Sequence, residues 1–224
     1  MIDPTTEARG AAAAAAAAEV ADGMTIGLGS GRAVWATIAE LAPRATSLQV
    51  VVASERTAEL ARDAGFELVE LDGQLRLDLA IDGADEVDPQ LGLIKGGGGA
   101  LLCEKIVVGA ARRFVVVAEE RKHVARLGDA HPLPVEIVRF AWRETRRRVL
   151  ELVPAADLRG GGDPFVTDEG HYILDCRVPS GGDLGDLGRA LEGITGVVEH
   201  GLFLGMADLV LLGRADGSVE RLER

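Results

Sequence analysis

The segment Met24-Thr-Ile-Gly-Leu-Gly-Ser-Gly31 runs directly into Arg32-Ala-Val-Trp-Ala-Thr-Ile38. Its first five residues predict a short apolar strand, and the glycines after them predict a tight turn. Val34, Ile38 and Leu41 then recur at the spacing of one helix face. A buried strand, a glycine turn and an amphipathic helix in succession are typical of the opening of a parallel α/β sheet.

The same alternation continues on both sides of this segment. An alanine run at 11–18 indicates the middle of a helix, and Ser54 is a candidate N-cap for a helix that ends near Gly65. Further strands are predicted at 48–53, 66–71, 77–81 and 114–118, with another helix at 99–112. Apolar strands separated by amphipathic helices predict a Rossmann-like parallel sheet that is covered by helices on both faces.

The pattern changes near Gly128, after which the chain predicts a smaller α+β unit. A stiff connector at 131–134 is followed by a strand at 135–138, a helix at 141–153, strands around Phe165 and at 172–178, and a helix at 184–191. This order suggests a ferredoxin-like domain inserted near the C-terminus. We therefore expect a catalytic domain formed by 1–127 plus 202–224 and a small domain at 128–201. Strands within 202–212 and a turn at 215–218 return the chain to the first domain.

Composition excludes several functional classes. The chain has 224 residues and a formal net charge of -12, so a nucleic-acid or anionic-membrane partner is not expected. No apolar run is long enough to cross a bilayer. Acidic residues precede the alanine run and no basic leader frames it, which argues against a signal peptide. We expect a cytoplasmic protein without a membrane partner.

Two other features favour structural interpretations. Cys103 and Cys176 are too few for a disulfide framework or a zinc cluster, and we expect both to be buried as small apolar residues. The basic run Arg146 to Arg148 lies within a predicted helix beside Glu144 and Glu151. We interpret this run as a solvated face with salt bridges rather than a phosphate site.

The glycine loop at 27–31 is a candidate phosphate site. Glycines before a helix let backbone N–H groups approach an anion, and Arg32 adds a fork of donors suited to phosphate. The loop does not match the dinucleotide fingerprint, because Arg32 replaces the third glycine, and no Lys-Ser/Thr pair completes a nucleotide-triphosphate loop. Taken alone, it supports a ligand site and a ligand-free turn about equally. The candidate substrate-binding residues here are Ser30, Gly31, Arg32 and Ala33.

An acidic loop follows the predicted strand at 77–81. It reads Asp82-Gly-Ala-Asp85-Glu-Val-Asp88, and ligands of parallel sheets bind beyond the carboxyl ends of the strands. A calcium loop is rejected, because Ala84, Val87 and Leu93 occupy the third, sixth and twelfth ligand positions. A solvated acidic turn would be the default interpretation if the next segment were unremarkable.

The next segment is Lys95-Gly-Gly-Gly-Gly-Ala100, and Glu104 follows about one turn into the predicted helix. Four consecutive glycines cost conformational entropy, which is tolerated where backbone amides must crowd a ligand. Their N–H groups form a natural oxyanion site, and Lys95 adds a cation. A phosphate cradle, a carboxylate, an ammonium and amide donors together suit proton transfer beside the carbonyl of a phosphorylated sugar.

These motifs resemble the type A ribose-5-phosphate isomerases. The resemblance is carried by the segments 82–86 and 95–106, by Ala130-His-Pro-Leu-Pro-Val-Glu136, and by Gly196-Val-Val and Gly201-Leu-Phe203. It implies interconversion of ribose 5-phosphate and ribulose 5-phosphate through an enediolate, in the non-oxidative branch of the pentose phosphate pathway. It also implies no cofactor and no metal, a phosphosugar substrate, and a homodimer or homotetramer.

The resemblance also implies roles for individual residues. Glu104 is then the catalytic base, with Asp82 and Lys95 as further catalytic groups. Lys95 and the amides of the glycine loop stabilise the enediolate, and the acidic loop contacts the sugar hydroxyls. Lys122, which would otherwise be interpreted as surface charge, lies near the phosphate. The implied substrate-binding residues beyond the first loop are Asp82, Gly83, Ala84, Asp85, Lys95, Gly96, Gly97, Gly98 and Lys122.

The chain departs from the family pattern at the phosphate loop. Family members usually read Thr-Gly-Ser-Thr where this chain reads Ser30-Gly-Arg-Ala33. We predict that Arg32 replaces the contacts of the missing hydroxyls, the alternative being that it points away; Arg9 is a further candidate near the phosphate. The competing functions are a non-catalytic phosphosugar sensor on the same fold and another enzyme on a related scaffold, such as an acyl-CoA transferase or a sugar-phosphate lactonase.

Overall fold

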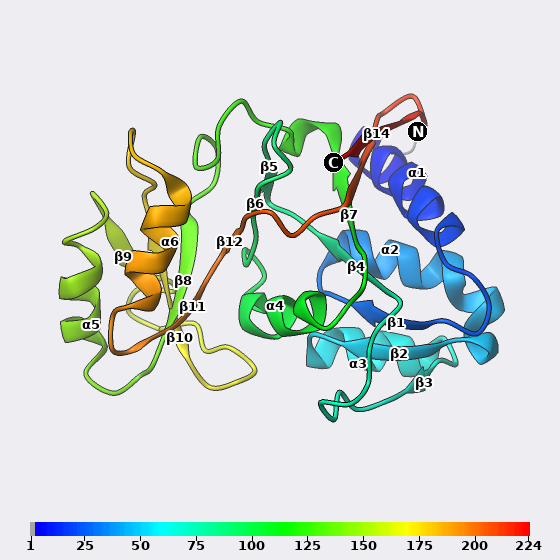
Figure 1. Ribbon diagram of the computed structural model, residues 1–224, viewed down its shortest axis with the longest axis horizontal. Coiled ribbons are helices and arrows are strands. Elements are labelled where there is room, and N and C mark those ends of the chain that lie inside the picture. Colours follow the sequence, from blue (N-terminus) through cyan, green and yellow to red (C-terminus); the bar gives the residue numbers. More distant parts are fainter. Residues whose placement is uncertain (1–2) are drawn as a thin grey trace.

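This computed structural model describes residues 3–224. Its largest sheet has seven strands and is mostly parallel (Figure 1). β14 is antiparallel to β13, and the other neighbours are parallel. From one edge to the other the strands are β14 (Val219–Glu223), β13 (Leu209–Gly213), β7 (Phe114–Glu119), β4 (Leu79–Gly83), β1 (Thr25–Leu28), β2 (Gln49–Val52) and β3 (Glu67–Leu68). The strand order reverses between β1 and β4, and in such sheets the crevice at this point binds ligands.

Helices cover both faces of this sheet. Successive side chains of β7 point to opposite faces and all of them are buried, so both faces must be covered. Val115 and Val117 face a core with α1 (Pro4–Ala18) and α2 (Arg32–Leu41), whereas Val116 faces the opposite core with α4 (Leu101–Gly109). The helix α3 (Glu55–Asp63) lies on the side of α1 and α2, and a 3-10 helix at Ala42–Ser47 follows α2. Both buried faces of the sheet are therefore apolar.

The helix α1 lies unusually close to β13. A side chain at Gly213 would place its Cβ 1.8 Å from the carbonyl oxygen of Ala8, which no packing adjustment of a side chain could relieve. Ala12 and Ala16 of the same helix are fully buried against the sheet. Small residues on the facing surfaces let helix and strand approach until their backbones touch.

A second unit contains an antiparallel four-stranded sheet in the order β11-β8-β10-β9. Figure 1 places this unit at the opposite end of the molecule from α1 and α2. Its elements follow one another as β-α-β-β-α-β, and its apolar core continues into Ile94, Leu127 and Leu202. In chain order they are β8 (Leu133–Ile137), α5 (Trp142–Val149), β9 (Ala156–Leu158), β10 (Tyr172–Cys176), α6 (Leu184–Glu192) and β11 (Val197–His200).

A three-stranded sheet of β5 (Glu86–Val87), β6 (Leu93–Ile94) and β12 (Leu202–Phe203) joins the two units. The outgoing chain passes a short 3-10 helix at Glu120–Lys122 and then reaches β8 through residues 123–132. Fully buried Glu86 holds this passage, because its carboxylate accepts hydrogen bonds from the N–H groups of Gly128, Ala130 and His131 at 2.5–2.6 Å. The passage between the units is therefore tied to β5.

The parallel sheet with helices on both faces was predicted correctly, and so was the helix through the alanine run. Ser54 caps α3 as expected, since its hydroxyl accepts a hydrogen bond from the Thr57 N–H. Of the strand predicted at 66–71, only the two residues of β3 are in a strand. The strand predicted at 77–81 begins two residues later, as β4. Leu77 instead forms an isolated bridge with Ala111.

The second unit required more correction. The strand predicted around Phe165 is wrong: Phe165 lies in a loop against Gly99, and the missing strand is β9, which was not predicted. The connector predicted at 131–134 already belongs to β8 from Leu133 onward, and α5 ends four residues earlier than expected. The boundaries of the two predicted domains stay predictions.

The remaining structural expectations are mostly met. Arg147 and Arg148 form salt bridges with Glu144 on an exposed helix face, as predicted. Cys176 is fully buried, but the expectation for Cys103 is wrong: it is half-buried on α4, where its thiol donates a hydrogen bond to Glu169 in a loop of the second unit. Within residues 3–224, no helix has both the length and the apolar character needed to span a membrane.

Candidate active site

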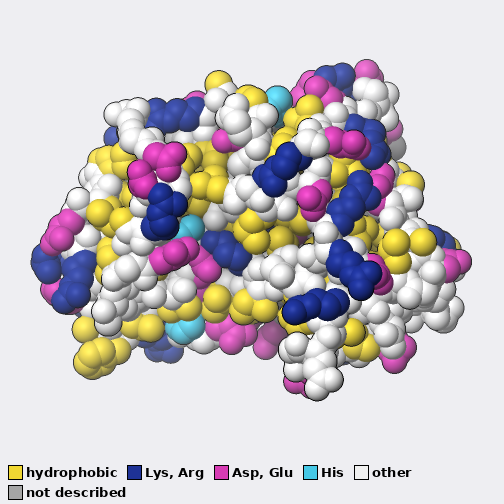
Figure 2. All heavy atoms as spheres, in the orientation of Figure 1, with side chains coloured by type: hydrophobic (Ala, Val, Ile, Leu, Met, Phe, Trp, Pro, Cys, Tyr) yellow, Lys and Arg dark blue, Asp and Glu magenta, His cyan; other side chains and the backbone are white. Residues whose placement is uncertain are grey.

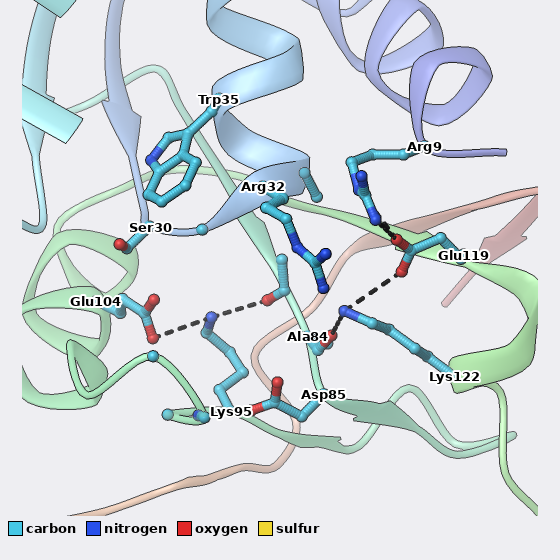
Figure 3. Close-up of a pocket in the computed structure, with 16 residues that line it drawn as sticks. Arg9, Ser30, Arg32, Trp35, Ala84, Asp85, Lys95, Glu104, Glu119 and Lys122 are labelled. Carbon is cyan, nitrogen blue, oxygen red and sulfur yellow. Dashed lines mark hydrogen bonds and ion pairs between the residues drawn. The ribbon is translucent and has the colours of Figure 1, made fainter. Parts of the chain in front are cut away.

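Three loops meet around a cavity of about 450 Å³ at the reversal point of the sheet (Figure 3). They are the loop after β1, the loop after β4 and the glycine loop before α4. This volume suits a small-molecule ligand. All but one of the predicted site residues line the cavity: Ser30, Gly31, Arg32, Ala33, Gly83, Ala84, Asp85, Lys95, Gly96, Gly97, Gly98, Glu104 and Lys122. The exception is Asp82, which lies behind Lys95 and is buried.

A buried ion triad forms one end of the site. The ammonium of Lys95 lies 2.8 Å from Asp82 Oδ2 and 3.1 Å from Glu104 Oε2, and it donates a hydrogen bond to the carbonyl oxygen of Gly83. All three side chains are at most 6% exposed. One cation is thus shared by two carboxylates in a site from which water is largely excluded.

This environment changes the protonation of the triad. Burial, and next the negative charge of Asp82, raise the pKa of Glu104 to about 8, although Lys95 opposes the shift. Burial also raises the pKa of Asp82. Burial lowers the pKa of Lys95, but the charges of Asp82 and Glu104 together outweigh it and raise this pKa, so the side chain stays charged. Glu104 is therefore tuned toward neutral pH, where a carboxyl group exchanges protons most effectively.

The position of Asp82 is set by the turn beneath it. Its Oδ1 accepts hydrogen bonds from the N–H groups of Gly83 at 2.7 Å and Ser30 at 3.2 Å. A side chain at Gly29 would place its Cβ 1.9 Å from the Asp82 carboxyl carbon, so the turn needs glycine there. The glycine loop at 27–31 is thus hydrogen-bonded to the ion triad through Asp82. Contact between Asp82 and the sugar hydroxyls stays a prediction, because this side chain does not reach the cavity wall.

The glycine loop presents its backbone to the cavity. Gly96 and Gly99 adopt φ values of 104° and 90°, which side-chain-bearing residues rarely adopt. Gly97 and Gly98 between them are exposed, and the Gly97 N–H donates to Asp85 Oδ2 at 2.7 Å. The loop therefore lines the same cavity as Glu104, and its use as an oxyanion site stays a prediction.

Basic side chains form the other end of the cavity. In Figure 3 the side chains of Arg32 and Lys122 point toward one another, on the opposite side of the view from Glu104. Lys122 donates to the carbonyl oxygen of Ala84 at 2.5 Å and lies 3.4 Å from Glu119 Oε2. Arg9 forms a salt bridge with the other oxygen of Glu119 at 2.6 Å.

Arg32 differs from Lys122 and Arg9, because its side chain is exposed and forms no salt bridge with any residue of 3–224. The space-filling view shows Lys and Arg side chains gathered over the region of α1, α2 and β7, although the whole chain is acidic (Figure 2). The cavity thus combines a basic end with a carboxylate end.

A group of possible metal ligands lies outside this cavity. Glu192, Glu199 and His200 bring ligand atoms within 4.8 Å of one another in the second unit. However, His200 Nδ1 accepts a hydrogen bond from the Leu202 N–H at 3.2 Å, which places the ring proton on Nε2, the atom that faces Glu192. A metal-binding imidazole normally donates from its second nitrogen, so this arrangement does not suit a metal.

Comparison with known proteins identifies the family. The family model described as Ribose 5-phosphate isomerase A (phosphoriboisomerase A) matches residues 49–217. The chain is 48% identical over 218 residues to the ribose-5-phosphate isomerase A of Synechococcus sp. (strain JA-3-3Ab), covering 94% of this chain and 95% of that protein. The chain belongs to the ribose 5-phosphate isomerase A family.

Other members of the ribose 5-phosphate isomerase A family agree over nearly the whole chain. The protein of Roseiflexus sp. (strain RS-1) is 50% identical over 208 residues, covering 90% of this chain and 89% of its own length. The solved structure of ribose 5-phosphate isomerase A from Methanocaldococcus jannaschii superposes with a TM-score of 0.91 at 35% identity, covering 98% of this chain and all of that one. A D-ribose-5-phosphate isomerase solved in complex with phospho-erythronic acid gives 0.92 at 36% identity, covering 98% of this chain and 99% of that one.

Two residues of this cavity were not predicted from the sequence. Glu119 ends β7, so it lies at the carboxyl edge of the strand next to β4, and that edge position was the available signal. Trp35 lies in the first turn of α2 and donates from its ring nitrogen to the Thr57 hydroxyl at 3.2 Å. Its side chain forms part of the wall beside Ser30 (Figure 3). Nothing in the sequence distinguishes this tryptophan from an ordinary core residue.

Proposed function

We infer that this chain is a ribose-5-phosphate isomerase, an aldose–ketose isomerase that interconverts D-ribose 5-phosphate and D-ribulose 5-phosphate in the pentose phosphate pathway. The observation that carries this function is the buried carboxylate of Glu104, 3.1 Å from the Lys95 ammonium and on the wall of the cavity. One carboxylate facing the reacting carbons is what transfer of a proton between neighbouring carbons requires.

The reaction we propose uses the two ends of the cavity separately. Glu104 removes the proton from C2 of the open-chain aldose and returns it to C1, while the proton of the C2 hydroxyl passes to the C1 oxygen. The enediolate oxygen between these steps faces Lys95 and the amides of the glycine loop. These donors are held in place before the reaction, so they can stabilise developing charge without reorganising. Asp82 holds the ammonium of Lys95 in position. In this proposal its part in opening the sugar ring is relayed by that ammonium, because Asp82 does not reach the cavity wall.

The phosphate occupies the basic end. Arg32 and Lys122 supply cationic donors, and the backbone around Gly31 lies at the start of α2, where the helix dipole favours an anion. Anchoring the phosphate far from the reacting carbons fixes the sugar against Glu104, so the proton moves over a short, defined distance.

Substitution of Glu104 by Gln tests this function. Coupled conversion of ribose 5-phosphate to ribulose 5-phosphate should fall by about a hundredfold or more in kcat, because the amide cannot accept the proton. Glu40→Gln, an exposed glutamate of the same helix that carries Trp35, is the matched control and should behave as wild type. Phospho-erythronic acid should still bind to Glu104→Gln, since the basic end is untouched.

The outcomes separate the competing functions. Equal turnover by Glu104→Gln and wild type would remove Glu104 from its role. A phosphosugar sensor would bind ribose 5-phosphate without converting it, and an acyl-CoA transferase would consume an acyl-CoA donor in a parallel incubation. The sensor is the less favoured alternative, because simple binding does not require a buried carboxylate beside a buried ammonium.

We also propose a finer division of the fold. Residues 1–127 plus 202–224 form a Rossmann-like catalytic domain, and 128–201 form a small ferredoxin-like domain. The strand order of the large sheet and the β-α-β-β-α-β succession of the second unit support this division. A homodimer or homotetramer and a cytoplasmic location, both expected from the sequence, stay predictions.

A further inference from the structure

Arg159 reaches from the second unit to the backbone of the glycine loop. It follows β9, and its guanidinium Nη1 donates to the carbonyl oxygens of Gly96 at 2.9 Å and Gly97 at 3.2 Å. Its other donors form a two-point contact with the Asp175 carboxylate, at 3.0 Å and 2.6 Å. Arg159 is 16% exposed and Asp175 is 25% exposed, so this interaction is partly shielded from water.

Holding these carbonyl groups also orients the amides that follow them. In a trans peptide the C=O and the next N–H point in opposite directions. With the Gly96 oxygen drawn toward Arg159, the Gly97 N–H faces away, and it donates to Asp85 Oδ2 at 2.7 Å. By the same geometry the Gly98 N–H points away from Arg159. Within residues 3–224 it donates to no protein group, and Gly98 lines the cavity.

We propose that Arg159 is a positioning residue of the isomerase, which fixes the Gly97 amide on Asp85 and orients and polarises the Gly98 amide toward the enediolate oxygen. This inference rests on the proposed function. A cationic donor on a peptide carbonyl strengthens the N–H of the same peptide as a hydrogen-bond donor. Arg159 does not line the cavity, so it acts through the loop and not on the substrate.

The proposal also gives the second unit a part in catalysis. Its arginine fixes the backbone of a loop that belongs to the large sheet, and the strands β9 and β10 hold the Arg159–Asp175 pair. The glycines need such a support, because a run of four has no side chains to fix its conformation.

Kinetics of Arg159→Ala and Arg159→Lys on ribose 5-phosphate test this role. The alanine variant should lose about tenfold or more in kcat, below the 10²–10³ of a fully removed oxyanion donor, with KM within about threefold of wild type. Arg159→Lys keeps the charge and the aliphatic chain but not the fork, and its kcat should lie between the two. Arg146→Ala is the matched control, since Arg146 also donates to a backbone carbonyl of the second unit, that of Ala156.

Added guanidinium at millimolar concentration provides a readout that a merely structural role would not move. It should restore part of the kcat of Arg159→Ala and leave wild type and Arg146→Ala unchanged. Unfolding curves show whether Arg159→Ala is folded. If it is not, the kcat of Arg159→Lys tests the proposal instead. An unchanged kcat, a raised KM alone, or no rescue of a folded variant would overturn the proposal. Wild type without isomerase activity would instead overturn the proposed function.

Discussion

Glu104 carries a carboxyl group whose protonation its neighbours control, and this predicts the pH dependence of the enzyme. The base must be ionised, so kcat/KM should rise with pH up to about 8, the raised pKa of Glu104, and then level off. Because the charge of Asp82 contributes to the raised pKa, Asp82→Asn should move the rising limb to lower pH, even where the maximal rate is reduced. Steady-state kinetics across pH 5–10 measures the shift.

Asp63→Asn is the control for this pH experiment, since Asp63 is exposed at the end of α3 and away from the cavity. Its profile should superpose on that of wild type. A limb that stays in place in Asp82→Asn would show that the Asp82 charge does not act on the base.

Arg32 has an exposed side chain at the basic end of the cavity, and its role can be measured directly. Arg32→Ala should raise the KM for ribose 5-phosphate about tenfold, the scale of one charge-assisted hydrogen bond of about 1.5 kcal/mol, and leave kcat nearly unchanged. Arg62→Ala, an exposed arginine of α3, should have no effect. An unaltered KM in Arg32→Ala would mean that this side chain does not touch the phosphate.

The sequence predicted the site residues that lie in recognisable motifs, and Lys122 only through the family resemblance. It missed residues that have no motif around them. Lys95 and Glu104 lie on either side of a run of four glycines, and the entropic cost of such a run can be inferred from the sequence alone. Glu119 and Trp35 carry no such local signal, since each reaches the cavity only through the strand and helix that it occupies. The buried position of Asp82 was also invisible, because it depends on the close approach of Gly29.

At the scale of elements, the contact of α1 with β13 predicts opposite effects for two glycines. Gly213→Ala should lower the free energy of unfolding by about 1–3 kcal/mol, because the new Cβ meets the backbone of Ala8 and helix and strand must separate. Gly10→Ala lies in the same helix with open space around it, and should raise stability by about 0.5–1 kcal/mol. Urea unfolding measures both. Equal effects would mean that this contact is not tight.

Strands of the large sheet were predictable because both of their faces are buried, and they therefore appear as continuous apolar runs such as 114–118. The second unit lacks that signal. β9 has only three residues, one of them Asp157 with an exposed side chain, so it resembles a loop. Phe165 resembles a strand residue, but its ring fills the space above Gly99, which belongs to the distant glycine loop. Such a contact cannot be seen in a local pattern.

At the scale of the whole molecule, the assembly state is the main prediction. The chain has a mass of 23.5 kDa, and light scattering after size exclusion should give two or four times this value. A mass of one chain at micromolar concentration would contradict the expectation.

The carboxylate of Glu86 affects what engineers can do with this molecule. Three amide protons from residues 128–131 converge on it, so this exposed stretch does not behave as a slack linker despite its surface position. A reporter domain inserted at Asp129 would remove the hydrogen-bond donors of the buried Glu86 carboxylate. It would also disrupt the passage of the chain between the two units. The tip at Asp216 and Gly217, whose hairpin bonds close beneath it, offers a safer point for grafting.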